Sequence, residues 1–214
     1  MNEYVLNHPL ITHKLAILRD KNTGTKEFRE LVTEISTILV YEAMWDAKLE
    51  QKTVETPLEK IDTGMLNEDN YAIVPILRAG MGMVDGVLNI IPNAKIGHIG
   101  LYRDEETFEP VEYYYKMPDG IDKREVLVVD PMLATGGSAS ATISRLKQDG
   151  VTKIKLLCIV AARQVSNALR KSILMLQYSV RLLIVSLTKM HIFYLVWEMP
   201  VTGCTEQNSE VQLH

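Results

Sequence analysis

Residues 128–138 have the types and order that suit the binding of a phosphate group. A run of apolar residues ends in a single acid, Asp130, and the loop that follows contains Thr135-Gly136-Gly137-Ser138. Glycines let the backbone approach an anion closely. The N–H groups at the start of a following helix, together with the hydroxyls, can donate hydrogen bonds to that anion. This order predicts a monophosphate site.

Two common nucleotide-binding motifs are missing from the same stretch. It has no Gly-Lys-Ser/Thr ending, so it is not a Walker loop, and it has no G-x-G-x-x-G dinucleotide fingerprint. A Thr-Gly-Gly-Ser turn is only moderately specific, because Ser or Thr can simply cap a helix after a tight turn. From these residues alone, both interpretations stay open.

Apolar runs of strand length alternate with segments of helical pattern along most of the chain. The expected strands are 71–77, 94–102, 124–130 and 152–160. The expected helices are 23–47, 79–91 and 138–150. Such alternation predicts an α/β fold with a parallel sheet covered by helices on both faces, whose ligands bind beyond the carboxyl ends of the strands.

Two polar segments interrupt this alternation. Residues 50–70 are rich in turn formers, and we expect a loop or a small hairpin. Residues 103–120 are too long for a tight connection, and their alternation predicts an extended flap or hairpin arm. The tyrosines at 113–115 in this flap could stack a base. The favoured alternative is that they pack the arm or contact a second subunit.

The overall composition is that of an ordinary globular protein of one domain. Of 214 residues, 47% are hydrophobic and 23% are charged, and the net charge of −4 does not support non-specific nucleic-acid binding. Cys158 and Cys204 have no metal-ligand spacing, and no protein metal site is expected. The N-terminus lacks a signal-peptide pattern, and Arg181 and Lys189 interrupt the apolar window 172–197. We therefore expect a cytoplasmic protein that does not span a membrane.

The stretch DPMLATGGS, together with the valines before it, resembles the signature for 5-phosphoribosyl 1-diphosphate (PRPP) in type I phosphoribosyltransferases. Most members carry two adjacent acids before the loop. Here Pro131 takes the second place, which resembles the uracil phosphoribosyltransferase version. Residues 8–35, 74–88 and 100–114 resemble the N-terminal region, the pyrophosphate loop and the flap of that family.

The resemblance covers residues 8 to about 162 and implies a fold. We expect a type I phosphoribosyltransferase-like parallel sheet flanked by helices, with an extended flap or hairpin arm. Residues 1–162 would form a PRPP-binding domain. The structure of the C-terminal quarter, residues 163–214, does not follow from the family.

The resemblance also implies roles for individual residues. Arg78 and Arg103 would hold the diphosphate, although from the residues alone each could form a surface ion pair. Asp130 would hold ribose hydroxyls and favour the positive charge that develops on the sugar, so Asp130 and Arg103 are the candidate catalytic residues. The remaining PRPP-site residues would be Pro131, Met132, Leu133, Ala134, Thr135, Gly136, Gly137 and Ser138. Residues 134–138 would surround the 5-phosphate.

The implied reaction converts uracil and PRPP to UMP and diphosphate. Family membership implies Mg²⁺ bridging the diphosphate and the ribose hydroxyls. It also implies a homodimer or larger assembly, with allosteric GTP in some members. No nucleophilic side chain is required, so we expect His8, His13 and His98 to have packing or capping roles.

Residues 163–214 depart from the family. They hold one of the twelve glycines and no aspartate, and their net charge is +2 against −6 for residues 1–162. The family has a stretch similar to Tyr-Ile-x-Pro-Gly-Leu-Gly-Asp-Ala-Gly-Asp-Arg here, whose backbone reads the pyrimidine edge. This chain has MHIFYLVWEMPVTG at 190–203 instead. The uracil-binding residues are therefore unknown.

The codons suggest a hypothesis for this departure. In a reading frame shifted by one base, Trp197 followed by Glu198 forces Gly, Met199 followed by Pro200 forces Ala, and residues 191–203 permit the family stretch. We hypothesise that the chain is frameshifted from about residue 163 onward. Resequencing codons 155–170 tests this, and an uninterrupted frame relative to homologous coding sequences would contradict it.

Three functions are weighed on this basis. The first is an active uracil phosphoribosyltransferase, and the second is a catalytically inactive PRPP-binding or regulatory protein. The third, a membrane-anchored protein, is disfavoured by the charges in the C-terminal window. For this polypeptide we expect little uracil transfer. We also expect exposed apolar surface and poor solubility, because LLIVSL (182–187) and HIFYLVW (191–197) have strong β-propensity.

Overall fold

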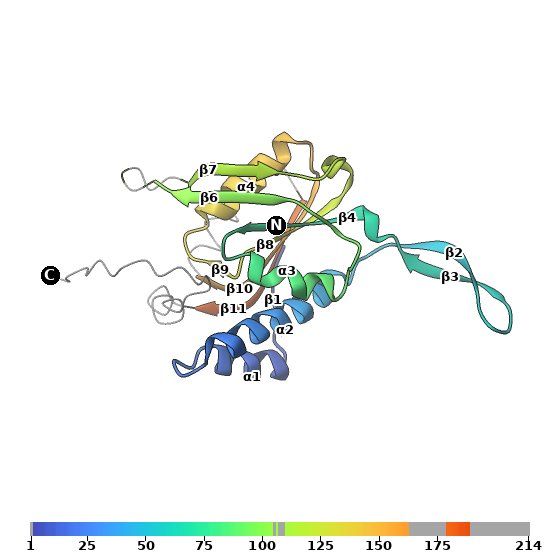
Figure 1. The fold of residues 1–214 in the computed structure, drawn as a ribbon, viewed down its shortest axis with the longest axis horizontal. Helices are drawn as coiled ribbons and strands as arrows, with labels where there is room; N and C mark the ends of the chain where they lie inside the picture. The colour runs from blue at the N-terminus through green and yellow to red at the C-terminus, as the bar shows by residue number, and fades with distance from the viewer. Residues whose placement is uncertain (1, 105, 107–109, 163–178, 189–214) are drawn as a thin grey trace.

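The structure, a computed structural model, describes residues 2–104, 106, 110–162 and 179–188 (Figure 1). A nine-stranded sheet has the order β1-β11-β10-β8-β4-β6-β7, with β5 paired to β4 and β9 paired to β10. Its strands are β1 Asn2–Val5, β4 Tyr71–Leu77, β5 Lys95–Ile96, β6 His98–Arg103, β7 Pro110–Lys116, β8 Glu125–Val129, β9 Met132–Leu133, β10 Lys153–Ala162 and β11 Ser179–Thr188.

The sheet is parallel apart from one hairpin. Only β6 and β7 pair antiparallel among the described strands of this sheet. The inner strands β4, β8 and β10 are buried almost throughout, as expected for strands covered on both faces. The predicted α/β parallel sheet is confirmed.

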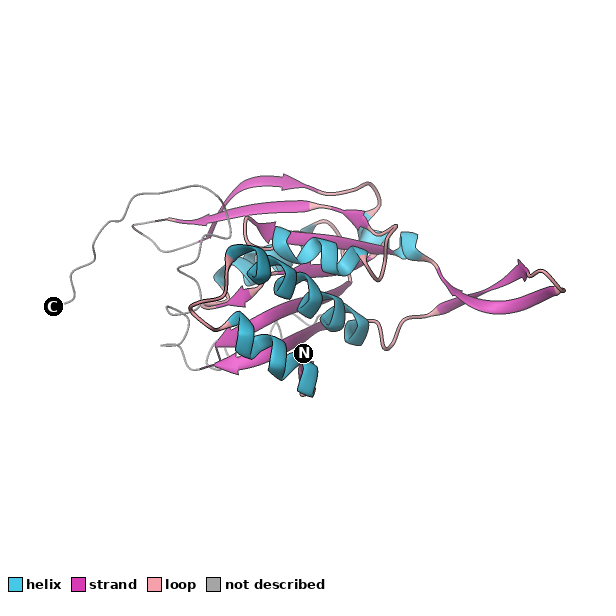
Figure 2. Cartoon of the chain, turned by 60° about the horizontal axis from the view of Figure 1, so that its bottom comes forward, coloured by secondary structure: helices cyan, strands magenta, loops and turns pink. Residues whose placement is uncertain are grey.

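Among the described residues, four α-helices and two short 3₁₀ turns complete the body of the protein. The elements are α1 Pro9–Leu18, α2 Thr25–Ala43, α3 Met81–Leu88, α4 Gly137–Gln148, η1 Glu68–Asn70 and η2 Ile121–Lys123. Figures 1 and 2 show α1, α2 and α3 together on one side of the sheet, with α4 apart from them beside β7. Helix α2 buries Phe28, Leu31, Val32, Ile35 and Leu39, at the three- and four-residue steps that its sequence predicts.

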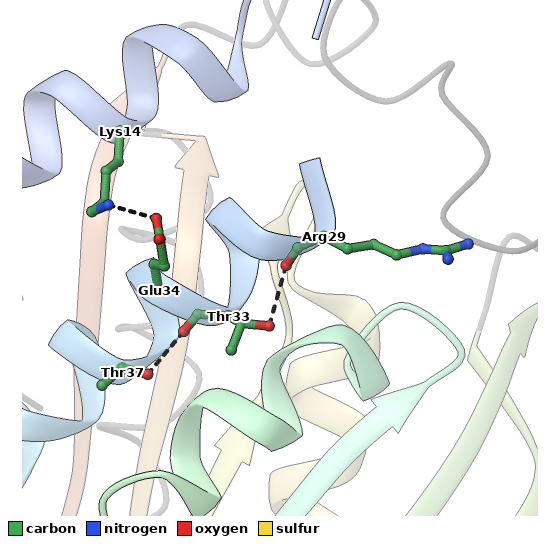
Figure 3. A network of polar contacts seen from close by, with 5 residues as sticks. All are labelled: Lys14, Arg29, Thr33, Glu34 and Thr37. Atoms are coloured by element: carbon green, nitrogen blue, oxygen red, sulfur yellow. Dashed lines mark hydrogen bonds and ion pairs between the residues drawn. The ribbon is translucent and has the colours of Figure 1, made fainter. Parts of the chain in front are cut away.

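Polar side chains join the three helices of this side. Lys14 of α1 forms an ion pair with Glu34 of α2 at 2.5 Å (Figure 3). The Thr33 and Thr37 hydroxyls donate to backbone carbonyls one turn back in α2. Thr37 also donates to the Gly86 carbonyl of α3 at 3.1 Å. Helix α2 is thereby fixed to both of its neighbours.

A buried lysine connects the sheet to the end of α2. Lys155 of β10 lies 2.7 Å from Asp46, 2.6 Å from Glu125 and 2.7 Å from the Ala43 carbonyl oxygen. A buried ammonium group is costly unless charges and hydrogen bonds compensate it. Three oxygen partners supply that compensation here.

Strand β11 corrects one expectation from the sequence. LLIVSL (182–187) is not an exposed apolar run, because it lies between β10 and β1 and pairs in parallel with both. Leu182, Leu183, Ile184 and Val185 are each 3% exposed or less. HIFYLVW and residues 163–178 lie outside the described residues. Within the described part of the chain, no helix is long and apolar enough to cross a membrane.

Two hairpins extend from the body. Residues 50–70 form the predicted small hairpin, from β2 Leu49–Glu55 and β3 Lys60–Leu66, which projects away from the sheet (Figures 1 and 2). The predicted flap is the hairpin of β6 and β7. We refer to these two strands and their connection as the flap.

Candidate active site

The chain leaves two neighbouring strands, β4 and β8, in opposite directions across the sheet. From β4 it passes through α3 to β6, and from β8 it passes through α4 to β10. Right-handed crossovers then place α3 and α4 on opposite faces. As a general rule, such a reversal gives a crevice at the carboxyl ends of the two strands, here β4 and β8, where ligands of such sheets bind. Arg78 directly follows β4 and Asp130 directly follows β8, so both candidate residues border this crevice.

Asp130 is held in place by the backbone around it. Its N–H donates to the Leu157 carbonyl of β10 at 3.2 Å, and its Oδ1 accepts from the Met132 N–H at 3.3 Å. Burial raises the pKa of Asp130 from 3.8 to about 7, and the Met132 hydrogen bond only partly opposes that shift. Near neutral pH, Asp130 can therefore exchange between a carboxylic acid and a carboxylate.

The loop after β9 ends in a glycine with left-handed backbone geometry. Gly136 has φ +79° and precedes α4, whose N-terminus has no side-chain cap. The alternative in which Ser or Thr merely caps this helix is therefore wrong. The unpaired N–H groups at the start of a helix, combined with its dipole, favour an anion at this position.

Backbone pairing with β10 involves three of the predicted PRPP-site residues, Pro131, Met132 and Leu133. The Pro131 carbonyl accepts from the Val160 N–H at 3.0 Å, and β9 pairs with β10. Pro131 and Leu133 are also buried. Any contact that these two residues make with a ligand must therefore come from their backbone atoms.

The loop after β4 packs tightly against the ends of two strands. A Cβ atom at Gly80 would lie 2.5 Å from the Val129 carbonyl oxygen and 2.7 Å from the Ile76 nitrogen and oxygen. Arg78, two residues before, is exposed and forms no ion pair with the described residues. The Leu77–Arg78 peptide bond is cis. Sequence reasoning singled out Arg78 but missed Gly80.

The flap reaches residues 134–138, which the sequence assigns to the 5-phosphate and which we call the phosphate loop. Arg103, the last residue of β6, donates from Nη2 to Oγ1 of Thr135. Pro110, the first residue of β7, lies near Gly137, where a Cβ atom would be 4.0 Å from its Cδ. The structure thus brings Arg103 to the loop that the sequence assigns to the 5-phosphate.

The three tyrosines of the flap have different surroundings. Tyr115 is partly buried and donates to Asp149, beyond the end of α4, at 2.5 Å. Tyr113 lies over Gly100, where a Cβ atom would be 2.5 Å from the ring. Tyr113 and Tyr114 are about half exposed. The packing role is therefore seen for Tyr115 and Tyr113, whereas base stacking stays a prediction.

Some side chains for which the sequence predicts no catalytic role have structural roles. His8 caps α1, because its Nδ1 accepts from the Leu10 N–H at 3.2 Å. Cys158 is buried in β10, and burial raises the pKa of its thiol. Cys204 lies outside the described residues. The Asp130 carboxylate adds to the rise in the Cys158 pKa, so this thiol lies near the end of β8.

Donors and acceptors of complementary kinds surround the crevice. Arg78 and Arg103 supply guanidinium groups, the start of α4 supplies N–H groups, and Asp130 supplies a carboxylate. Guanidinium and helix N–H groups bind phosphate oxygens, and a carboxylate accepts hydrogen bonds from hydroxyls. This combination suits a sugar that carries phosphate groups at both ends.

A parallel sheet of this topology, with a phosphate loop at the crevice and a hairpin flap beside it, defines a type I phosphoribosyltransferase. The family model described as uracil phosphoribosyltransferase matches residues 5–190. The chain therefore belongs to the uracil phosphoribosyltransferase family, an enzyme family of the pentosyltransferase class.

Individual relatives agree with this assignment. A uracil phosphoribosyltransferase of Geobacillus sp. (strain WCH70) is 53% identical over 169 residues, which are 79% of this chain and 81% of the relative. One of Clostridium beijerinckii is 56% identical over 167 residues, which are 78% and 80% of the two chains. The solved structure of the AQ2163 protein from Aquifex aeolicus has a TM-score of 0.82 at 33% identity, over 87% of this chain and 88% of that one.

Proposed function

We propose that the crevice between β4 and β8 binds PRPP and that the reaction performed there is phosphoribosyl transfer to uracil, giving UMP and diphosphate. One observation carries the proposal. The uncapped N-terminus of α4 and Asp130 lie on the same short segment after β8, so one ligand can meet both. The relatives named uracil phosphoribosyltransferase support uracil as the acceptor.

Each side chain has a distinct task in this proposal. Residues 134–138 hold the 5-phosphate with backbone N–H groups and hydroxyls. Arg78 and Arg103 bind the diphosphate and stabilise the negative charge that it gains as it leaves. Asp130, as a carboxylate, accepts hydrogen bonds from the ribose hydroxyls and stabilises the positive charge of an oxocarbenium-like transition state. The protein thus contributes positioning and electrostatics rather than a nucleophile.

Magnesium fits this site as an ion carried mainly by the substrate. No group of three or more His, Cys, Asp or Glu residues in the described part of the chain could hold a metal ion. At the crevice, Asp130 supplies a carboxylate, and Mg²⁺ commonly combines one or two carboxylates with phosphate oxygens and water. Bound there, Mg²⁺ would neutralise part of the diphosphate charge.

The uracil-binding part of the family lies near the C-terminus, where this chain departs from the family pattern. We propose residues 1–162 as the PRPP-binding domain and residues 163–214 as a segment that replaces the uracil-binding part of the family. The relatives align over 74–79% of this chain, and the family model matches residues 5–190, which extends beyond this boundary. The stretch at 190–203 lies outside the described residues. Its lack of the family motif favours a second candidate function, an inactive PRPP-binding protein.

Calorimetric titration with Mg·PRPP, followed by a transfer assay, separates the two candidates. Protein of verified intact mass is incubated with PRPP, Mg²⁺ and labelled uracil, and UMP and diphosphate are measured. Formation of both products in equal amounts supports the transferase. PRPP binding without UMP supports the inactive binding protein and the frameshift hypothesis.

Arg78 offers a direct test of diphosphate binding. Arg78→Met is expected to weaken the binding of Mg·PRPP by about tenfold or more, because a charge-assisted hydrogen bond to phosphate contributes more than a neutral one. The free energy of unfolding should stay unchanged within about 0.5 kcal/mol, since the side chain is exposed and unpaired among the described residues. Calorimetric titration and urea denaturation measure both quantities.

The matched control is Arg29→Met. Arg29 is an exposed arginine of α2 whose side chain points away from the polar network of that helix (Figure 3). This change should leave PRPP binding intact. Equal weakening by both substitutions would show that only net charge matters and would remove Arg78 from the proposed site.

The family also implies assembly and regulation, which we include in the proposal. A homodimer or larger assembly is supported by large apolar side chains on the β2–β3 hairpin and at its base. Leu58 at the hairpin turn is 96% exposed, and Trp45 is 80% exposed. Allosteric GTP rests on the family resemblance alone.

A further inference from the structure

Helix α4 and strand β7 are joined by a compact polar cluster at the end far from the phosphate loop. Arg145 donates from Nη1 to Oδ1 of Asp149 at 2.5 Å, and Tyr115 donates from its hydroxyl to Oδ2 of the same carboxylate at 2.5 Å. The Arg145 guanidinium carbon lies 3.9 Å from the centre of the Tyr115 ring. Glu112 completes the cluster, with its Oε2 3.6 Å from Nε of Arg145. We call these four residues the flap latch.

An irregularity in β7 makes the latch possible. Gly100 pairs with Tyr114 and Leu101 pairs with Glu112, so Tyr113 is an extra residue without a partner in the ladder. In a regular strand, residues three apart point to opposite faces, and Glu112 and Tyr115 could not both reach α4. A bulge re-aims side chains in this way, and it brings both residues to Arg145.

The glycine at position 100 accommodates that bulge. The Tyr113 ring occupies the place where a side chain at 100 would lie, because a Cβ atom there would be 2.5 Å from the ring. The flap is therefore shaped so that one face of β7 meets α4. The bulge and the latch thus give structural roles to Tyr113 and Tyr115 of the tyrosine run.

The C-terminus of α4 carries a negative charge, which is unusual for a helix C-terminus. Asp149 is the first residue after α4 and caps its C-terminus, and Gly150 follows with φ +86°. A carboxylate at a helix C-terminus is unfavourable, because the helix dipole is negative there. Arg145 and the Tyr115 hydroxyl compensate this charge. Burial, followed by the hydrogen bond to Asp149, raises the pKa of Tyr115, so its hydroxyl stays a donor at neutral pH.

The latch lies at one end of a contact whose other end is the candidate active site. Pro110 starts β7 near Gly137 at the beginning of α4, and Tyr115 meets Asp149 at its end. Five steps of strand span about 17 Å and twelve residues of helix about 18 Å, so β7 and α4 match in length. Strand β6, paired with β7, carries Arg103 to Thr135. The flap is thus fixed to the helix that carries the phosphate loop.

We propose that Arg145, Asp149 and Tyr115 are positioning residues of the transferase: they hold the flap against α4 so that Arg103 lies where the diphosphate of PRPP binds. This inference rests on the proposed function, because it assumes that PRPP is the ligand. The flap touches the 5-phosphate loop through Arg103 and Thr135, but the N–H groups at the start of α4 belong to the helix itself. The latch should therefore affect binding of the diphosphate more than binding of the 5-phosphate.

The test compares two ligands in Arg145→Met and in the wild-type chain. Calorimetric titration should show binding of Mg·PRPP weakened by about tenfold, a usual size for coupling between separate sites. Binding of ribose 5-phosphate should change by less than about twofold, because its main donors are N–H groups of α4 and not groups of the flap. Arg145→Lys should restore most PRPP binding, because the ion pair to Asp149 can reform. Arg29→Met is the control for loss of a surface charge.

Hydrogen exchange of the flap provides a second readout that needs no ligand. Amides of β6 and β7 should exchange faster in Arg145→Met, while those of β4 and β8 stay unchanged. Equal weakening of both ligands, or unchanged PRPP binding with unchanged flap exchange, overturns the latch. If the wild-type chain binds neither ligand, the proposed function fails instead. The exchange rates alone then decide the latch, and equal rates in β7 overturn it.

Discussion

Asp130→Asn is expected to weaken Mg·PRPP binding by about tenfold or more at pH 8, because an amide cannot replace the charge of a carboxylate near ribose hydroxyls and a metal ion. With a pKa of about 7 for Asp130, its ionised fraction rises from about a tenth at pH 6 to about nine tenths at pH 8. Wild-type affinity should therefore gain about tenfold from this residue over that interval. Calorimetry at both pH values measures the gain, and the gain should be absent in Asp130→Asn.

The same substitution should stabilise the protein in the absence of ligand. In the unfolded chain Asp130 ionises near its ordinary pKa of 3.8, whereas in the folded chain it keeps its proton up to about pH 7. Since the folded state binds more protons in this window, wild-type stability falls as pH rises from 4 to 7. Asparagine does not ionise, so Asp130→Asn does not lose stability as the pH rises. It should therefore be more stable than the wild type by about 1–3 kcal/mol at pH 8.

Urea denaturation at pH 4 and pH 8 tests the sign of this effect. The advantage of Asp130→Asn should appear at pH 8 and vanish near pH 4, where both side chains are neutral. A substitution that lowers stability at pH 8 would mean that Asp130 is charged and compensated in the folded protein. A binding group that destabilises its own fold is expected at a functional site.

Gly80→Ala is expected to lower the free energy of unfolding by about 3 kcal/mol, the upper range for inserting atoms into a packed site. The added Cβ would lie 2.5 Å from the Val129 carbonyl oxygen and 2.7 Å from two backbone atoms of Ile76. Backbone atoms inside the sheet cannot rotate away, so either β8 or the loop after β4 must move. Because Arg78 and Asp130 border that contact, PRPP binding should also be lost.

Gly82→Ala is the matched control, two residues further along. Its Cβ would meet only the Val32 Cγ1, at an ordinary 3.6 Å, on an exposed turn of α3. Alanine in a helix interior is favoured over glycine, so this variant should gain about 0.5–1 kcal/mol. Comparable stability of both variants in urea would show that the loop after β4 adapts freely, contrary to the tight packing described here.

Local sequence patterns predicted the elements around the site well. The apolar runs at 71–77 and 124–130 are strands β4 and β8, and the helical spacing within 23–47 gives α2. Hydrophobic periodicity and segment length suffice to predict such elements, because their side chains pack into one continuous core. The crevice then follows from topology, since Arg78 and Asp130 come directly after two neighbouring parallel strands.

Long-range contacts could not be predicted in this way. Strand β11 joins β1 across almost the whole chain, and nothing local in LLIVSL indicates that pairing. The latch between Arg145 and Tyr115 depends on a bulge at Tyr113 that an alternating pattern hides. The crowding at Gly80 is likewise set by the end of β8, about fifty residues away in sequence.

The most direct test of the account is a calorimetric titration of the folded, mass-verified chain with Mg·PRPP at pH 8. We predict one saturable site per chain that ribose 5-phosphate displaces and that Arg78→Met weakens. This result is expected whether or not uracil is then converted to UMP. A folded chain that shows no PRPP binding, or binding that ribose 5-phosphate cannot displace, would contradict the assignment of the crevice between β4 and β8 as the PRPP site.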